Sequence, residues 1–224
     1  MGKTAKIITI VLGVIMIILS VLLLYINTVV TGPLAEGFIT PIIALEFLNN
    51  TSDLSNFFDI ITVDSLKSSL YLGNRIDFAY MFSYGIFALM CGRLMYIETK
   101  VKALWLSFPL VALIITADAF ENLNIAELLA MNEYQNAGLI LDQLQLFTWL
   151  KWGSLSALML LYSVYFLQGN WWKILIGIVL SSPFILYGVA FYFRGLYCEI
   201  FSLTIMLSFL GLLTFSFFWK PIRQ

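Results

Sequence analysis

Residues 7–30 read IITIVLGVIMIILSVLLLYINTVV and contain no charged side chain. Lys3 and Lys6 precede this run. A helix of about 20 apolar residues crosses the hydrocarbon core of a bilayer, which is about 30 Å thick. The run is too long for a secretory signal, and no small-residue cleavage pattern follows it. The segment therefore predicts a retained membrane-spanning helix.

The composition of the whole chain is that of a membrane protein. Of its 224 residues, 61% are hydrophobic and 11% are charged, and the mean hydropathy is +0.95, whereas a soluble domain carries about 25% charged residues. Its long apolar runs do not alternate as the strands of a β-barrel do. We predict an all-α, polytopic helical membrane protein with a single membrane domain over residues 1–224. The six predicted transmembrane helices are 7–30, 77–97, 103–123, 144–167, 172–193 and 198–219.

The long connection between the first two predicted helices is residues 31–76. Structureless loops of more than about 15 residues are uncommon, and this segment contains IIALEFLNN at 42–50, which is too short to cross a bilayer. Thr51, Ser52 and Asp53 are candidate caps for a further short helix. We expect two or three short helices that form an outer cap on the bundle. A surface loop on the lipid headgroups is the alternative.

The basic residues predict an orientation, because short cytoplasmic loops of membrane proteins are enriched in Lys and Arg. With a cytoplasmic N-terminus, six spans place the C-terminus in the cytoplasm too, and most basic residues then lie on the cytoplasmic side. We predict a multi-pass protein of the cytoplasmic (inner) membrane in this orientation. The cytoplasmic residues would be Lys3, Lys6, Arg93, Lys100, Lys102, Lys173, Lys220 and Arg223, against Lys67, Arg75 and Arg194 outside.

Three polar residues follow an uncharged apolar run in ITADAFENLNIAE at 115–127. Asp118, Glu121 and Asn122 are three and four positions apart, so they project from one face of a helix. Apolar residues continue after them, which favours acids turned into the protein over acids at the wet end of a helix. We keep the wet end as the alternative, since a charge near the interface costs little.

Other polar residues are expected near the same depth. Glu46 shows the same spacing to two asparagines, while Asp77 begins the second predicted helix and Tyr80 and Tyr84 extend its face. These residues form a candidate ligand-binding pocket together with Arg75. Arg194 and Lys151 are the remaining candidate charge partners, although Lys151 could instead extend to the interface. The predicted pocket therefore consists of Glu46, Asp77, Asp118, Glu121, Asn122, Arg75 and Tyr80.

Missing residue types restrict the chemistry. The chain has no histidine and two cysteines, Cys91 and Cys198. Imidazole bases and zinc sites with histidine ligands are thus excluded, and no metal or other cofactor is assigned. The two cysteines are predicted at opposite ends of the bundle, too far apart for a disulfide. A net charge of −1 argues against nucleic acid as a partner.

The order ALEFLNN, IDFAYMFSYGIFAL and ADAFENLNI resembles an uncharacterised bacterial multi-pass membrane protein family. Its members share a glutamate motif, an L-D-x-x-F-like motif and a D-x-x-E-N motif. The likeness covers about residues 33–125, and I-D-F-A-Y departs from the second motif. The resemblance implies that Glu46, Asp77, Asp118, Glu121 and Asn122 act together. It implies no activity.

Three hypotheses for function follow. The pocket binds or transports a small ligand or cation; or two of its acids catalyse a reaction on a lipid or lipid-linked substrate; or the acids only hold the cap onto the bundle of an accessory subunit. Whether the protein is an enzyme, and which residues would be catalytic, stays open. The bilayer is the expected partner. Gly177 and Ser181 could seat a second copy or another membrane subunit, although packing within the chain is the simpler expectation.

Overall fold

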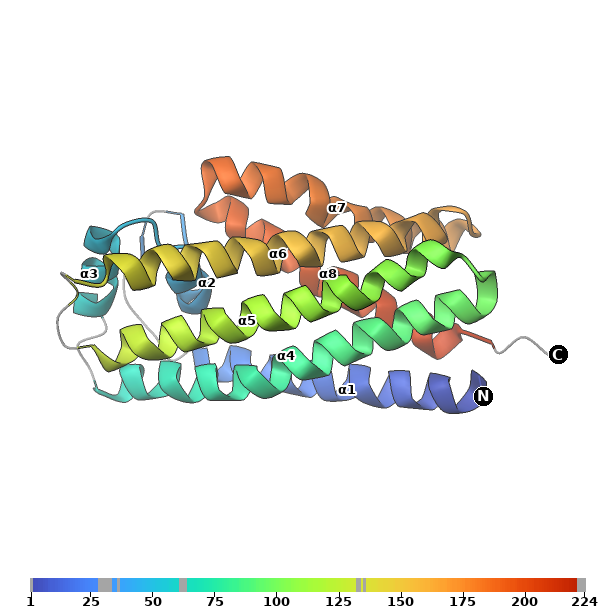
Figure 1. Cartoon of the computed structure of the whole chain (residues 1–224), viewed down its shortest axis with the longest axis horizontal. Coiled ribbons are helices and arrows are strands. Elements are labelled where there is room, and N and C mark those ends of the chain that lie inside the picture. The colour runs from blue at the N-terminus through green and yellow to red at the C-terminus, as the bar shows by residue number, and fades with distance from the viewer. Residues whose placement is uncertain are drawn as a thin grey trace.

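The computed structural model describes residues 2–27, 34, 35, 37–60, 64–131, 134 and 136–220. Over these residues it contains eight α-helices, one 3-10 helix and no strand. Six helices are long and apolar enough to cross a membrane, which confirms the predicted polytopic all-α class. They run roughly parallel to one long axis (Figure 1). The six are α1 (Gly2–Asn27), α4 (Asp64–Thr99), α5 (Ser107–Ala130), α6 (Gly138–Leu167), α7 (Trp171–Phe193) and α8 (Leu196–Phe218).

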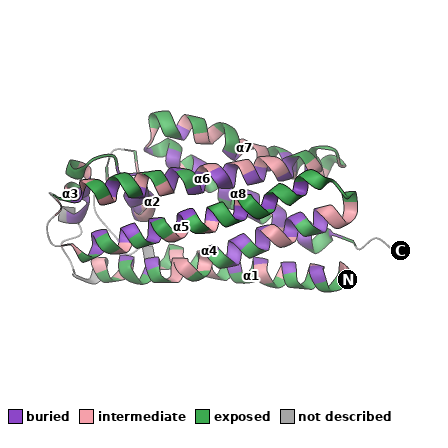
Figure 2. Cartoon of the chain, viewed as in Figure 1, coloured by how far each residue is buried: buried purple, intermediate pink, exposed green. Residues whose placement is uncertain are grey.

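The bundle is built by neighbours in sequence. α1 packs on α4, and α4, α5, α6, α7 and α8 pack each on the next. α8 also contacts α1, α4 and α6, which closes the bundle. Figure 2 shows buried residues on the inward faces of the helices and exposed residues on their outer faces. Many exposed residues are large and apolar, such as Ile18, Ile185 and Leu203, as expected for a surface in contact with lipid tails.

α4 begins earlier than the sequence predicts. The second membrane helix was expected at residue 77, but α4 starts at Asp64 and is 36 residues long. The segment 64–76 contains no proline, and its Leu70 is buried in the apolar core of the cap. Packing therefore continues the helix through a stretch whose polar composition resembles a loop. As a result, Asp77 lies inside a helix and not at its start.

α5 also differs from its predicted bounds. A 3-10 turn, Lys102–Leu106, comes first, and the α-helix then runs from Ser107 to Ala130, beyond the expected end at residue 123. Pro109 lies in its first turn, where no intrahelical N–H is lost. Ile125, Leu128 and Leu129 near its end pack on the cap. This contact explains why the helix continues past its acidic residues.

Two short helices, α2 (Pro41–Glu46) and α3 (Thr51–Ile60), lie between α1 and α4 in the sequence. Pro41 is the first residue of α2, a position that suits its fixed φ angle. Leu45, Leu54 and Phe57 are buried against the ends of α5 and α6. The predicted cap of short helices is thus present at one end of the bundle (Figure 1).

The turn between α7 and α8 holds α2 in place. Glu199 on α8 accepts hydrogen bonds from the amides of Ile39 (3.0 Å) and Thr40 (2.8 Å) and from the Thr40 hydroxyl (2.8 Å). Arg194 donates to the carbonyl of Phe47 at 3.2 Å, just after α2. α2 is therefore held at both ends, and this fixes the position of Glu46, its last residue.

The same turn needs an unusual backbone. Arg194 and Gly195 both have positive φ angles, 47° and 50°, and together they reverse the chain between two membrane helices. Gly37, with φ +85°, lies so close that a Cβ atom there would be 3.0 Å from the amide nitrogen of Leu196. Only glycine suits both this conformation and this close approach.

Gly177, Cys91 and Cys198 are all buried within the bundle. A Cβ atom on Gly177 would lie 2.9 Å from the Leu167 side chain of α6, so this glycine serves packing within the chain. Cys91 and Cys198 are both free and buried, as predicted.

Candidate functional site

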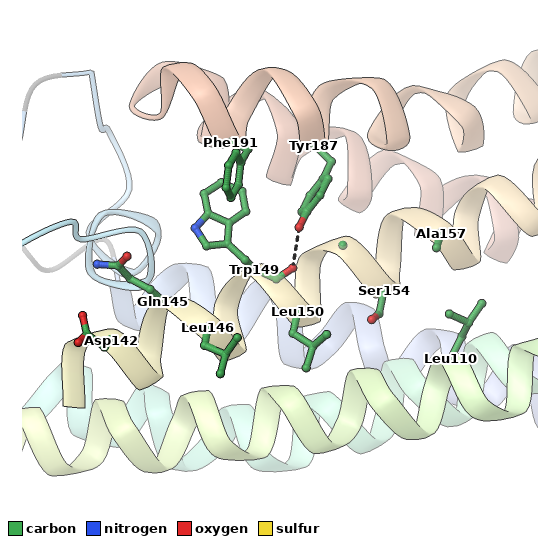
Figure 3. A pocket seen from close by; sticks show the side chains of 11 residues that line it. Leu110, Asp142, Gln145, Leu146, Trp149, Leu150, Ser154, Ala157, Tyr187 and Phe191 are labelled. Carbon is green, nitrogen blue, oxygen red and sulfur yellow. Dashed lines mark hydrogen bonds between the residues drawn. The ribbon is translucent and has the colours of Figure 1, made fainter. Parts of the chain in front are cut away.

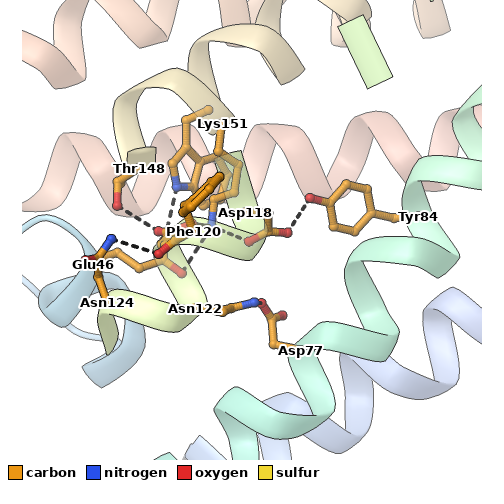
Figure 4. A network of polar contacts seen from close by, with 11 residues as sticks. Glu46, Asp77, Tyr84, Asp118, Phe120, Asn122, Asn124, Thr148 and Lys151 are labelled. Atoms are coloured by element: carbon orange, nitrogen blue, oxygen red, sulfur yellow. Dashed lines mark hydrogen bonds and ion pairs between the residues drawn. The ribbon is translucent and has the colours of Figure 1, made fainter. Parts of the chain in front are cut away.

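Lys151 on α6 lies among three carboxylates that come from two other helices, α2 and α5. Its Nζ is 3.4 Å from Glu46 Oε1 of the cap and 3.3 Å from Asp118 Oδ1 of α5, and it also contacts Glu121 Oε2 of α5. Figure 4 shows the side chains of Lys151, Glu46 and Asp118 pointing toward one another. All four side chains are buried. A lysine ammonium has three donors, which matches the three acids around it.

Neighbouring groups complete the cluster. Glu121 accepts a hydrogen bond from Thr148 at 2.8 Å, and Glu46 accepts one from the indole N–H of Trp152 at 3.0 Å. Thr148, Lys151 and Trp152 are three and four positions apart on α6, so one helix face supplies the ammonium and two neutral donors. The Lys151 Nζ also lies 5.0 Å from the Trp152 ring centroid.

A second set of contacts connects the cluster to α4. Tyr84 donates to Asp118 Oδ2 at 2.5 Å. Asn122 donates to Asp77 Oδ2 at 2.8 Å, and Asn74 donates to the carbonyl of Asn122 at 2.9 Å. The acids of α4 and α5 are therefore held in one hydrogen-bonded arrangement (Figure 4).

A cavity of about 240 Å³ lies beside this arrangement. Its polar walls include Glu46, Asp77, Asp118 and Lys151, and its apolar walls come mainly from α1 and α8. We call it the carboxylate cavity. Ligand pockets for drug-sized molecules have volumes of about 300–1,000 Å³, so this cavity suits a smaller ligand. Its aromatic lining residues are Tyr80, Tyr84, Trp152 and Phe209.

The cavity contains a hydrogen-bond acceptor without a partner. Asn74 is 4% exposed and lines the cavity, and its Oδ1 atom has no hydrogen-bond partner among the described residues. A buried acceptor without a donor costs about 1–3 kcal/mol. Asp77, which is half-buried on the same wall, accepts a side-chain hydrogen bond from Asn122 alone among the described residues. This wall therefore presents acceptor atoms to the cavity.

The charges in the cluster do not balance. Four carboxylates face one ammonium group within the described part of the site. Buried charges without partners are costly, so the cluster requires protons or a bound cation to approach neutrality. Burial raises the pKa of the Glu46 carboxyl above its usual range, while the nearby Lys151 charge opposes this shift.

The structure brings most of the predicted site residues together. Glu46, Asp118 and Glu121 surround Lys151, while Asn122 links Asp77 to the same region. Tyr80 lines the cavity and packs edge-on against Tyr84, with ring centroids 5.1 Å apart.

The two arginines lie elsewhere. The Arg75 side chain is exposed and forms no ion pair with a described acid. It is two positions from Asp77, and neighbours at that spacing point to different sides of a helix. Arg194 binds the Phe47 carbonyl and lies 5.9 Å from the Trp149 ring centroid, so it serves the cap and not the acids.

Sequence reasoning missed several residues of the site. Thr148 and Trp152 were not considered, although both share a helix face with Lys151. Tyr84 extends the same face of α4 as Asp77 and Tyr80 but was left out of the predicted pocket. Asn74 had no signal, because its segment was expected to belong to the cap of short helices and not to the second membrane helix.

A larger hollow lies on a different face of α6 (Figure 3). It has a volume of about 590 Å³ and lies between α5 and α7, with mostly apolar walls. Its charged lining residue is Asp142, which is exposed. The buried acids do not line it, so the carboxylate cavity is the better candidate for specific binding.

No protein-family model, no curated protein and no solved structure matches this chain.

Proposed function

We propose that this membrane protein binds a small organic cation, a protonated amine that keeps N–H donors, in the carboxylate cavity. The observation that carries the proposal is the set of acceptors on the cavity wall. Among the described residues, Asn74 Oδ1 is buried without a donor, and Asp77 has a side-chain donor only in Asn122. A ligand with positive charge and hydrogen-bond donors would satisfy both and reduce the negative charge of the site.

The chemistry of the cavity favours an organic cation over a metal ion. Lys151 already occupies the point where Glu46, Asp118 and Glu121 converge. The described residues contain no group of three acids or cysteines suited to hold a metal ion. Aromatic rings line the cavity, and organic cations bind the faces of such rings. The cavity thus offers charge and aromatic surface but few free metal ligands.

Binding has more support than transport. Transporters commonly bind their substrate between half-helices that are broken near the middle of the membrane. α7 continues through Pro183 as one helix, and the long helices around the cavity are continuous too. We therefore propose a receptor-like or sensor-like role for the cavity.

One observation favours the enzyme alternative. The cavity is lined in part by Leu24 on α1 and Met206 on α8, which are 52% and 40% exposed on the outer surface of the bundle. A lipid or lipid-linked substrate could enter there from the bilayer. However, Lys151 is paired with three of the four acids, which leaves Asp77 as the freest candidate for acid–base chemistry. Turnover of an added lipid would favour this alternative.

We further propose that the cap end faces away from the cytoplasm in the cytoplasmic membrane. The described charged residues at the opposite end are mostly basic, and this supports a cytoplasmic location for that end. The carboxylate cavity would then receive its ligand from the outer side or the outer leaflet.

The test is a binding titration with methylammonium chloride on the full chain in lipid nanodiscs. We expect saturable binding in the wild type and at least about tenfold weaker binding in Asp77→Asn, because a hydrogen bond or contact with a charged group is worth about 1.5–3 kcal/mol. Asp142→Asn is the matched control, since this exposed acid lies outside the cavity. Sodium, magnesium and calcium chloride are titrated in parallel.

Three outcomes would reject the proposal. Equal affinity of Asp77→Asn and the wild type would show that the cation binds outside the carboxylate cavity. Tight binding of calcium or magnesium in place of methylammonium would indicate a metal site. Absence of saturable binding in a folded wild type, checked by thermal unfolding, would favour a structural role for the acids.

A further inference from the structure

The end of the bundle opposite the cap is strongly basic. Both described chain ends and the α4–α5 and α6–α7 connections lie there (Figure 1). The described acid at this end is Glu98. Its Oε1 lies 3.1 Å from Lys173 Nζ, and its Oε2 accepts a hydrogen bond from the Tyr165 hydroxyl. The other basic residues have no acidic partner within the described chain. The described basic residues at this end are Lys3, Lys6, Arg93, Lys100, Lys102, Lys173 and Lys220.

A second cavity, of about 910 Å³, lies at this end. Arg93 and Lys100 line it, and both are exposed. We call it the basic pocket. Its walls come from α4, from the 3-10 turn and start of α5, and from the residues at the two chain ends, Gly2 and Trp219. It shares no residue with the carboxylate cavity.

The basic pocket contains a buried donor without an acceptor. Trp219 is 2% exposed and lines the pocket, and its indole Nε1 has no hydrogen-bond partner among the described residues. An indole nitrogen can only donate. The Trp219 carbonyl is held by Lys6 at 2.7 Å, which fixes the backbone beside the ring. The pocket therefore offers a buried N–H and two cationic groups to the same occupant.

The apolar lining indicates what else the occupant must contain. Ile86, Leu89 and Met90 extend from the basic residues along α4, and Ile86 is 43% exposed on the outer surface. Trp105 and Phe108 stack with ring centroids 5.5 Å apart, and both are more than half exposed. Such aromatic rings are typical of the headgroup region of a bilayer. The occupant thus needs an anionic head beside an apolar chain.

We propose that the basic pocket binds an anionic glycerophospholipid of the adjacent leaflet. Its phosphate would accept from Arg93, Lys100 and the Trp219 N–H, and an acyl chain would lie along Ile86 and Met90. Guanidinium and ammonium groups are the usual phosphate ligands of proteins, and basic pockets between membrane helices bind anionic headgroups. The proposal does not depend on the organic-cation proposal for the other cavity.

The experiment measures retained lipid on the full chain by native mass spectrometry, with phosphatidylglycerol and phosphatidylcholine offered together. The wild type should retain phosphatidylglycerol preferentially. Arg93→Gln/Lys100→Gln should reduce this retention by about tenfold or more, and Trp219→Phe by about fivefold, as expected for two charge-assisted contacts and one neutral donor. Lys102→Gln/Lys220→Gln removes the same charge at the same end, outside the pocket, and should stay within about twofold of the wild type.

Several results would overturn the proposal. Equal losses in the two double variants would show attraction by net charge without a defined pocket. Unchanged retention in Arg93→Gln/Lys100→Gln would place the lipid elsewhere; both side chains are exposed, so this variant should fold. Displacement of the lipid by inorganic phosphate or glycerol 3-phosphate at equal concentration would indicate a site for a soluble phosphate. The Trp219→Phe result counts only if this variant unfolds at the same temperature as the wild type. If its unfolding temperature falls, Arg93→Gln/Lys100→Gln alone decides the outcome.

Discussion

Lys151 is buried about midway along α6, where its ammonium group contacts carboxylates from α2 and α5. At 1.5 Å per residue, Asp118 and Glu121 lie about 16–21 Å along α5 from Ser107. A bilayer core is about 30 Å thick, so these acids lie well inside the span and not at its start. A charge at such a depth needs a partner of opposite charge. Lys151 is that partner for the three acids, and the acids are the partners of Lys151.

Replacement of Lys151 by methionine should therefore destabilise the protein by about 3–5 kcal/mol, because it leaves buried carboxylates without their cation. Denaturant unfolding in detergent micelles measures the change. Lys173→Met is the matched control. Its ion pair with Glu98 is partly exposed, with side chains 19% and 33% accessible, and should contribute no more than about 1 kcal/mol.

A double variant separates charge from packing. Lys151→Met/Glu121→Gln removes one acid together with the cation, while the glutamine can still accept from Thr148. We expect it to recover part of the lost stability. If Lys151→Met lowers the free energy of unfolding no more than Lys173→Met does, the buried cluster does not stabilise the fold.

The residues of the site differ in how well their sequence context predicts them. Spacing on a single helix was sufficient to group Asp118, Glu121 and Asn122. It could not select Lys151 over Arg75 or Arg194, because that choice depends on how α4, α6 and the α7–α8 turn are rotated and packed. Contacts between distant segments carry no local signal.

At the level of elements, the cap helix α2 depends on contacts outside itself. It has six residues, and isolated helices shorter than about 12 residues are marginal in water. Glu199 holds the segment before it, and Arg194 holds the residue after it. The α7–α8 turn therefore controls the position of Glu46 in the site.

Glu199→Gln should loosen this cap without unfolding the bundle. The variant keeps an oxygen acceptor for the amides of Ile39 and Thr40 but loses the charge that strengthens those bonds. We expect a local cost of about 1–2 kcal/mol, which is roughly five- to thirtyfold faster amide hydrogen exchange in α2. Hydrogen-exchange mass spectrometry measures it.

Glu127→Gln serves as the control for this experiment, because Glu127 is exposed near the end of α5. Its α2 amides should exchange as in the wild type, and amides in the middle of α5 should not change in either variant. Unaltered exchange of α2 in Glu199→Gln would mean that the apolar contacts of the cap are sufficient to hold it.

The prediction of elements from sequence succeeded where long apolar runs determine the structure and failed at their polar extensions. α7 and α8 lie within about two residues of their predicted bounds. α4 and α5 are longer than expected, since Leu70 and Leu128 pack on the cap beyond the apolar runs. Hydropathy detects contact with lipid, whereas these extensions are stabilised by contact with protein.

At the scale of the whole molecule, the two candidate sites lie at different levels of one bundle. The carboxylate cavity is bounded by the cap helix α2, while the basic pocket includes both described chain ends. The first site has an excess of carboxylates and the second an excess of cations. This polarity along the long axis (Figure 1) matches the bias of basic residues toward the cytoplasm that orients membrane proteins.

The proposed orientation can be tested by thiol labelling with a membrane-impermeant maleimide. Ser52→Cys places a thiol on the exposed surface of α3 in the cap, and Gln168→Cys places one in the exposed α6–α7 connection. The native Cys91 and Cys198 are both 0% exposed and should contribute little background. Intact spheroplasts should label Ser52→Cys, whereas Gln168→Cys should react only after the membrane is opened. The reverse labelling pattern would show the opposite orientation. The carboxylate cavity would then open toward the cytoplasm, and the basic pocket would lie in the outer leaflet.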